Sequence, residues 1–133
     1  MNETNSPVAL VVDDDPLICM DAVGMLEDAG FEVLDAPNVE LALGLLREHH
    51  PRLTLLFTDV QMPGEHDGFH LAREVARCWP HISIVVASGQ ANPTPGDMPQ
   101  GASFISKPFS AGVVHDALRQ IVPEHRRPKP LRG

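Results

Sequence analysis

The chain has few cysteines, no long apolar run and little positive charge. Cys19 and Cys78 lie far apart in apparent helices, which favours reduced thiols that are buried or partly buried, as in a cytoplasmic protein. No apolar run is long enough to span a bilayer. The N-terminus also lacks the basic and apolar regions of a signal peptide. We therefore expect a cytoplasmic protein with no membrane contact.

Positive charge is scarce and unevenly distributed. The formal net charge is −8, yet residues 123–133 carry four basic groups and one acid. The preceding residues hold six basic and 17 acidic groups. So acidic a body argues against direct nucleic-acid binding, which needs a basic face. It fits a protein that binds a divalent cation.

The length of 133 residues, with 43% hydrophobic and 21% charged residues, is that of one globular domain. We expect the domain to cover residues 7–122. A disordered leader, residues 1–6, is expected before it, and a flexible tail rich in proline and arginine, residues 123–133, after it.

Apolar segments alternate between the patterns of strands and helices. The expected strands are Val8–Val12, Phe31–Ala36, Leu53–Asp59, His81–Ala87 and Ala102–Ser106. The expected helices run from Pro16 to about Ala29, from a cap at Asn38 to Pro51, from about His66 to Trp79, and from a cap at Ser110 to Val122. This order predicts a parallel α/β sheet with helices on both faces and right-handed crossovers.

Helix ends and apolar stripes can be assigned at the same level. Asp15 is expected to cap the first helix, Pro16 to open it and Gly30 to follow its end. The buried stripe of that helix is expected at Leu17, Met20, Ala22, Val23 and Leu26. That of the second helix is expected at Val39, Leu41, Ala42, Leu45 and Leu46.

A helix is missing from the pattern between the last two strands. Pro93, Pro95, Gly96 and Pro99 fall between Gly89 and Gly101, a density of helix breakers that an ordinary helix does not tolerate. We predict an irregular loop there, or one helical turn at most.

Chemically active side chains gather at the strand ends. Asp13 and Asp14 follow the first strand, Asp59 ends the third, Ser88 the fourth and Lys107 the fifth. The carboxyl ends of parallel strands lie at one edge, where open α/β sheets bind ligands. Three carboxylates there repel one another unless they share a cation, and oxygen donors suit Mg²⁺ or Mn²⁺. An acid, a metal, a lysine and a hydroxyl are the parts needed to accept a phosphoryl group on a carboxylate.

These residues, with their neighbours, resemble a response-regulator receiver domain of bacterial two-component signalling. The matching segments are Val11-Val12-Asp13-Asp14-Asp15-Pro16, Thr58-Asp59-Val60-Gln61-Met62-Pro63-Gly64, Asp67-Gly68, Ala87-Ser88-Gly89 and Lys107-Pro108-Phe109. The resemblance extends from about Val8 to Val122. It implies a flavodoxin-like doubly wound sheet in the order 2-1-3-4-5. It also implies that Asp59 is phosphorylated from the phosphohistidine of a histidine kinase or a phosphotransfer protein.

The resemblance also implies individual roles around the metal. Asp14 would be a direct Mg²⁺ ligand, Asp13 would hold the ion largely through water, and the main-chain carbonyl of Gln61 would complete the protein's ligands. Lys107 would pair with the phosphoryl group, and Ser88 would move to bind it.

Two further features follow from the same resemblance. The Lys107–Pro108 peptide would be cis, an isomer that costs little before proline. Phe104 occupies the position of the aromatic switch residue. Because it has no hydroxyl group, it serves either as a switch or in packing alone.

Some patterns have simpler interpretations. The acids Asp13–Asp15 also suit the N-terminus of a helix, and Ser88 and Lys107 taken singly suit turns. His66 and His70 have i,i+4 spacing, but a zinc site needs further ligands that the sequence does not place. We therefore assign this histidine pair no chemistry and interpret it as a solvated helix start.

The resemblance leaves output and alternatives open. No output domain is expected after residue 122, so the chain is expected to signal through an unknown downstream protein or to act as a phosphate shuttle or sink. The Gln90–Gln100 loop is expected to be mobile and to become ordered on phosphorylation or partner binding. One alternative is a phosphorylation-independent adaptor. Another is an aspartyl-phosphate phosphohydrolase of the haloacid-dehalogenase type, which needs an acid where this chain has Gln61.

Overall fold

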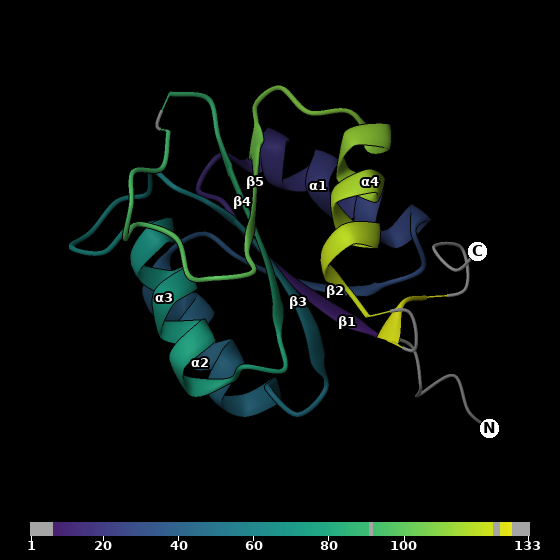
Figure 1. Cartoon of the computed structure of the whole chain (residues 1–133), viewed down its shortest axis with the longest axis horizontal. Coiled ribbons are helices and arrows are strands. Elements are labelled where there is room, and N and C mark those ends of the chain that lie inside the picture. Colours follow the sequence, from purple (N-terminus) through teal and green to yellow (C-terminus); the bar gives the residue numbers. More distant parts are fainter. Residues whose placement is uncertain (1–6, 91, 124–125, 129–133) are drawn as a thin grey trace.

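Five parallel strands form one sheet in the order β2-β1-β3-β4-β5 (Figure 1). The computed structural model describes residues 7–90, 92–123 and 126–128. The strands are β1 (Val8–Val12), β2 (Glu32–Ala36), β3 (Leu53–Asp59), β4 (Ser83–Ser88) and β5 (Ser103–Ser106). The helices are α1 (Pro16–Asp28), α2 (Val39–His49), α3 (Gly68–Cys78) and α4 (Ala111–Ile121). This is the doubly wound α/β fold and strand order that the sequence predicts.

Helices cover both faces of the sheet, α2 and α3 on one and α1 and α4 on the other (Figure 1). The alternation of side chains along β1 explains the two cores. Leu10 and Val12 face the α2–α3 layer, whereas Ala9 and Val11 face the α1–α4 layer. Every residue of β3 is buried, because this strand lies at the centre of the sheet. Asp59 therefore ends a fully buried strand.

Side chains at the helix ends fix where the helices begin. Asp15 Oδ1 accepts hydrogen bonds from Leu17 N (2.9 Å) and Ile18 N (3.2 Å), and Gly30, just beyond α1, has φ of 104°. The predicted caps at Asn38 and Ser110 also bind amides of their first turns. The prediction for α3 is wrong by two residues. The predicted start was about His66, but Asp67 caps this helix, so it begins at Gly68.

Two predicted apolar stripes need correction. The first helix turns Leu17 and Met20 to solvent, with 73% and 68% of their surface exposed. The buried residues of this helix are Ala22 and Leu26. At 3.6 residues per turn, Met20 lies about 160° round the helix from Ala22 and therefore on the opposite side. Leu41 in α2 is likewise 55% exposed. Both cysteines are free thiols, as expected, and Cys19 is partly buried. Cys78, which was expected to be at least partly buried, is exposed.

No helix joins β4 to β5 among the described residues 89, 90 and 92–102, as the proline and glycine content predicts. The connection is held by side chains. Arg73 of α3 donates a hydrogen bond to the carbonyl of Asp97 (2.9 Å). The Asp97 carboxylate accepts from both the amide and the hydroxyl of Thr94 (2.8 Å each). Met98 packs against the α2–α3 core, so this segment partly covers the area a helix would occupy.

Part of the expected tail lies against α4. Arg127 donates hydrogen bonds to the carbonyls of Val122 (2.8 Å) and Arg119, and Arg126 donates to the carbonyl of His81 (3.3 Å). The remainder of the tail and the expected leader, residues 1–6, lie outside the described residues. None of the helices described is long and apolar enough to cross a membrane.

Candidate functional site

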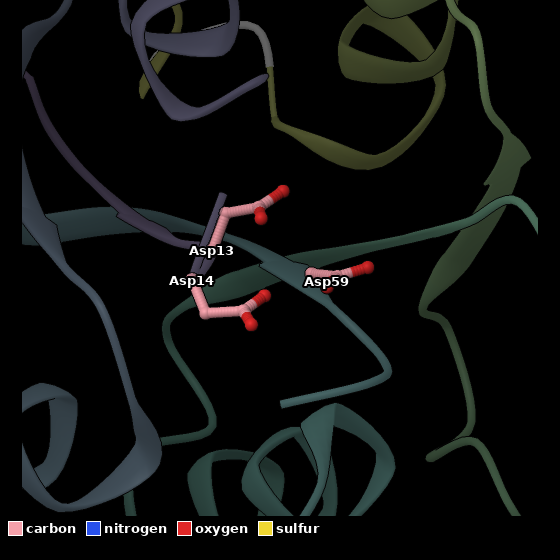
Figure 2. A group of neighbouring side chains, drawn as sticks. All are labelled: Asp13, Asp14 and Asp59. Carbon is pink, nitrogen blue, oxygen red and sulfur yellow. The ribbon is translucent and has the colours of Figure 1, made fainter. Parts of the chain in front are cut away.

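Three carboxylates meet at the carboxyl edge of the sheet (Figure 2). Asp13 and Asp14 follow β1, and Asp59 ends the adjacent β3. One oxygen from each of the three lies within 4.8 Å of the others. Asp13 and Asp59 are each 7% exposed, whereas Asp14 is exposed. We call these three residues the acid cluster.

Lys107, just beyond β5, reaches into the acid cluster. Its Nζ donates hydrogen bonds to Asp59 Oδ1 (2.8 Å) and Asp13 Oδ2 (3.1 Å), and its side chain is 15% exposed. The Lys107–Pro108 peptide is cis, as the resemblance implies. With its three carboxylates ionised, the acid cluster has a charge of −3, and Lys107 reduces this to −2. It therefore retains negative charge for a metal ion.

Burial and charge oppose each other at this contact. Desolvation raises the pKa of Asp59, the hydrogen bond from Lys107 lowers it, and the charge of Asp13 raises it again, so that the net shift is upward. Desolvation alone lowers the pKa of Lys107, but the hydrogen bonds and charges of Asp59 and Asp13 together outweigh it and raise this pKa. The ammonium group therefore stays charged, and a second cation beside Asp59 favours its ionised form.

Both carboxylate oxygens of Asp13 already accept a hydrogen bond. Its Oδ1 accepts a hydrogen bond from the amide of Asp15 (2.9 Å), and its Oδ2 accepts from Lys107. Asp14 instead faces solvent. A cavity of about 610 Å³ opens beside both acids and is also lined by Asp35 and Cys19. The donor set, two buried carboxylates and the exposed carboxylate of Asp14, fits a hard divalent cation such as Mg²⁺.

The backbone around Asp59 is held by two residues whose role the sequence did not reveal. Thr58 is fully buried, and its hydroxyl donates to the carbonyl of Asp59 (2.9 Å). Gly68, the first residue of α3, lies so close that a Cβ built there would be 1.8 Å from the same carbonyl oxygen. Its amide donates to the carbonyl of Val60 (2.8 Å). The Asp67-Gly68 pair was the one available signal for this close approach.

The remaining predicted residues differ in their relation to the acid cluster. Ser88 ends β4 and is 3% exposed; its hydroxyl accepts from the amide of Gln90 (3.3 Å), and its carbonyl accepts from the amide of Lys107 (3.0 Å). Gln61 is exposed, two residues after Asp59. Phe104 is partly buried and packs against the α2–α3 core. The structure thus unites Asp13, Asp14, Asp59 and Lys107 directly, with Ser88 beside Lys107.

Sequence comparison identifies the family to which this arrangement belongs. Residues 9–119 match the family described as the response regulator receiver domain. The chain therefore belongs to the receiver-domain family of two-component signalling, as its motifs suggested. Members of this family are signalling domains.

Particular relatives agree with this assignment. The chain is 34% identical over 106 residues to the nitrogen assimilation regulatory protein NtrX of Azorhizobium caulinodans, covering 77% of this chain and 23% of that one. It is 32% identical over 128 residues to the transcriptional regulatory protein PdtaR of Mycobacterium tuberculosis, covering 93% of this chain and 60% of that one. A receiver-domain crystal structure from Clostridium thermocellum aligns with a TM-score of 0.72 and 28% identity, over 84% of this chain and 90% of that one. The chain spans less than two thirds of both regulators, so their similarity concerns the receiver portion.

Proposed function

We propose that Asp59 accepts a phosphoryl group from the phosphohistidine of a histidine kinase or phosphotransfer protein, in a reaction that depends on Mg²⁺ or Mn²⁺. The observation that carries this proposal is the placement of Asp59. It is a buried carboxylate 2.8 Å from Lys107 and within 4.8 Å of oxygens from two further acids. Asp59 supplies a nucleophile, and the ammonium group of Lys107 supplies positive charge that stabilises the arriving phosphoryl group.

In the proposed transfer, a carboxylate oxygen of Asp59 attacks phosphorus while the bond from phosphorus to the donor's imidazole nitrogen breaks. The bonding electron pair leaves with the imidazole, which takes up a proton. Lys107 exchanges its contact with Asp59 for an oxygen of the phosphoryl group, and the Ser88 hydroxyl donates to another. These two side chains stabilise charge on the transferred group without any covalent step of their own.

The metal would be held by carboxylates of Asp14 and Asp59 and by the main-chain carbonyl of Gln61, with Asp13 acting through water. The exposure of Asp14 and the two hydrogen bonds already made by Asp13 support this division of roles. When bound, the ion supplies neutralisation of charge on the phosphoryl oxygens.

Phosphorylation would be passed on through protein–protein contacts, or the chain would serve as a phosphate shuttle or sink. The switch role proposed for Ser88 rests on its place beside Lys107 at the end of β4. Phe104, one strand further out, would either change its packing or remain fixed.

The proposal is tested by labelling the protein with a small phosphodonor such as acetyl phosphate, with Mg²⁺ and with a chelator. We expect label on the wild type in Mg²⁺ and at least a hundredfold less on Asp59→Asn, since loss of a nucleophile removes the reaction (roughly 10²-fold or more). Equal labelling of both proteins contradicts the assignment of Asp59. Labelling of neither, in a folded protein, favours a phosphorylation-independent adaptor. Rapid catalytic turnover of the phosphodonor, as opposed to slow hydrolysis of the aspartyl phosphate, would instead indicate a phosphohydrolase.

A further inference from the structure

Two histidines lie together at the junction of the β3–α3 loop and α3, and the proposed phosphoryl transfer uses neither. His66 precedes Asp67, the N-cap of α3, and His70 is in the first turn of that helix. Their imidazole rings are stacked, with centroids 3.9 Å apart and planes inclined by 13°. Both side chains are partly exposed, so an ion from solvent can reach them.

The backbone at this junction fixes where the two side chains start. The carboxylate of Asp67 accepts the amide of His70 (2.9 Å), and the amide of Gly68 donates to the carbonyl of Val60 (2.8 Å). With Asp67 as the N-cap, His66 is the residue before the cap and His70 is the third residue of the helix, so both side chains start at the same end of α3. The two rings therefore start close together, and binding one ion between them costs their stacking contact and the rotation that turns their nitrogens toward a common point.

We propose that His66 and His70 chelate a divalent transition-metal ion of the copper and zinc class, at a site separate from the acid cluster. Imidazole nitrogens suit these ions, and affinity should be greatest for Cu²⁺. Mg²⁺ selects oxygen ligands instead, so the two sites take different ions. Two nitrogens on one tetrahedral zinc are roughly 3.3 Å apart, given Zn–N bonds of about 2.0–2.1 Å. The rings now lie face to face with nearly parallel planes, and an imidazole nitrogen donates in the plane of its ring. Both side chains must therefore rotate out of the stack before their nitrogens converge on one ion, a rotation that their partly exposed positions permit.

The surrounding charge favours a cation here. Glu74 lies one turn beyond His70 in α3. The hydrogen bond from Arg77 lowers the pKa of Glu74 most, and positive charge on His70 and His66 lowers it further. The Glu74 carboxylate is therefore within electrostatic range of both rings, although its ion pair with Arg77 (2.7 Å) leaves only part of its charge to offset that of a bound ion.

The number of protein ligands sets the kind of site. Within the part of the chain that the structure describes, the acid cluster is the one group of three side chains with metal-ligand atoms close together. The histidine pair therefore supplies two ligands, and water supplies the rest. We expect an ion that exchanges with solvent and binds more weakly than in a structural zinc site, which has four protein ligands.

The test uses the full chain without a polyhistidine tag, in excess Mg²⁺ so that the acid cluster is occupied. Isothermal titration with Zn²⁺ should give one site, and Cu²⁺ should broaden the imidazole NMR signals of His66 and His70 first. His70→Gln and His66→Gln should each weaken Zn²⁺ binding about tenfold or more, since changing a mere neighbour of a ligand costs about 10–100-fold. Glutamine is acceptable at the third position of a helix, and the melting temperature checks the fold of each variant.

His81→Gln is the matched control, because His81 lies near His50 in the other histidine group, with ring centroids 6.4 Å apart. It should bind Zn²⁺ as the wild type does. Unchanged affinity in His70→Gln, or a loss in His81→Gln instead, overturns the proposal. Asp59→Asn should retain the site, so failure of the phosphoryl-transfer proposal and failure of this one give different results.

Discussion

Lys107 has two partners before any reaction takes place, and this accounts for the state of the site at the scale of single residues. Its ammonium group bridges Asp59 and Asp13, whose carboxylates are both largely buried. Without that charge, two neighbouring buried acids would repel each other and one would take up a proton. In the proposed reaction Lys107 keeps Asp13 and exchanges Asp59 for the phosphoryl group. The Lys107–Asp13 contact therefore holds the ammonium in place during transfer.

Gly68 is the residue whose replacement should most directly disturb Asp59 without touching its carboxylate. In Gly68→Ala the new Cβ would be 1.8 Å from the Asp59 carbonyl oxygen, so the start of α3 or the end of β3 must shift. We expect the free energy of unfolding to fall by about 1–3 kcal/mol, as in overpacked cores, measured by urea denaturation. Labelling by acetyl phosphate should fall by up to about 10²-fold, because positioning errors near 1 Å have that effect.

Gly44→Ala in α2 is the matched control. A Cβ at Gly44 meets nothing within 4 Å, and the position is inside a helix, where alanine is favoured over glycine by about 1 kcal/mol. This variant should be more stable than the wild type and should be labelled equally well. If Gly68→Ala keeps wild-type stability and labelling, the start of α3 accommodates the new methyl group without moving Asp59, and the prediction is wrong.

The sequence contains enough information to predict which side chains of the candidate site lie together, but not which residues support them. Asp13, Asp59 and Lys107 could be predicted because strand ends are easily located and parallel strands bring their ends to one edge. Gly68 and Thr58 act through contacts with the Asp59 carbonyl, and such contacts depend on how closely α3 approaches β3. That distance is a property of packing, which no local pattern encodes.

At the scale of elements, the caps of the helices were predictable and their buried faces were less so. Asp15, Asn38 and Ser110 bind amides within their own segments, so local sequence determines them. The first helix, in contrast, has apolar residues all round. Which of them are buried depends on how it rests on the sheet, and that placement exposes Leu17 and Met20.

The connection between β4 and β5 has no helix in its described residues and is held by a few side-chain hydrogen bonds. We expect these bonds to limit the motion of the connection. Arg73→Ala removes the hydrogen bond to the Asp97 carbonyl, which is worth about 1 kcal/mol. Amide hydrogen exchange of residues 92–100 should then be about fivefold faster, by the corresponding change in the opening equilibrium. In the wild type, a phosphate mimic with Mg²⁺ should slow exchange in the same residues if the loop becomes ordered on activation.

Arg77→Ala on the same helix provides the control, because Arg77 pairs with Glu74, three residues earlier in α3 (2.7 Å), and not with the described residues of the loop. Its loop amides should exchange at the wild-type rate. Strong protection of residues 92–100 before any phosphate mimic is added would contradict the expectation that this loop is mobile in the resting state.

At the scale of the whole molecule, two features attract cations: the net negative charge of the chain and the acid cluster. The net charge of −8 attracts any cation weakly, whereas the acid cluster gathers three carboxylates around a single lysine. The two effects respond differently to ionic strength, because exposed and widely spaced charges are screened by salt. Stabilisation by Mg²⁺ at constant ionic strength therefore reports on the cluster.

Mg²⁺ at about 100 times its dissociation constant should stabilise the wild type by roughly 2.7 kcal/mol. For a domain of this size that is a rise in melting temperature of about 10 °C, measurable by calorimetry. Asp14→Asn should lose most of this rise, because Asp14 is the exposed acid of the cluster and the proposed direct ligand. Asp28→Asn removes one exposed acid at the end of α1 and changes the net charge equally, so it should keep the full rise. Equal losses in both variants would show that Mg²⁺ acts on the charge of the molecule as a whole, and the acid cluster would then not be its binding site.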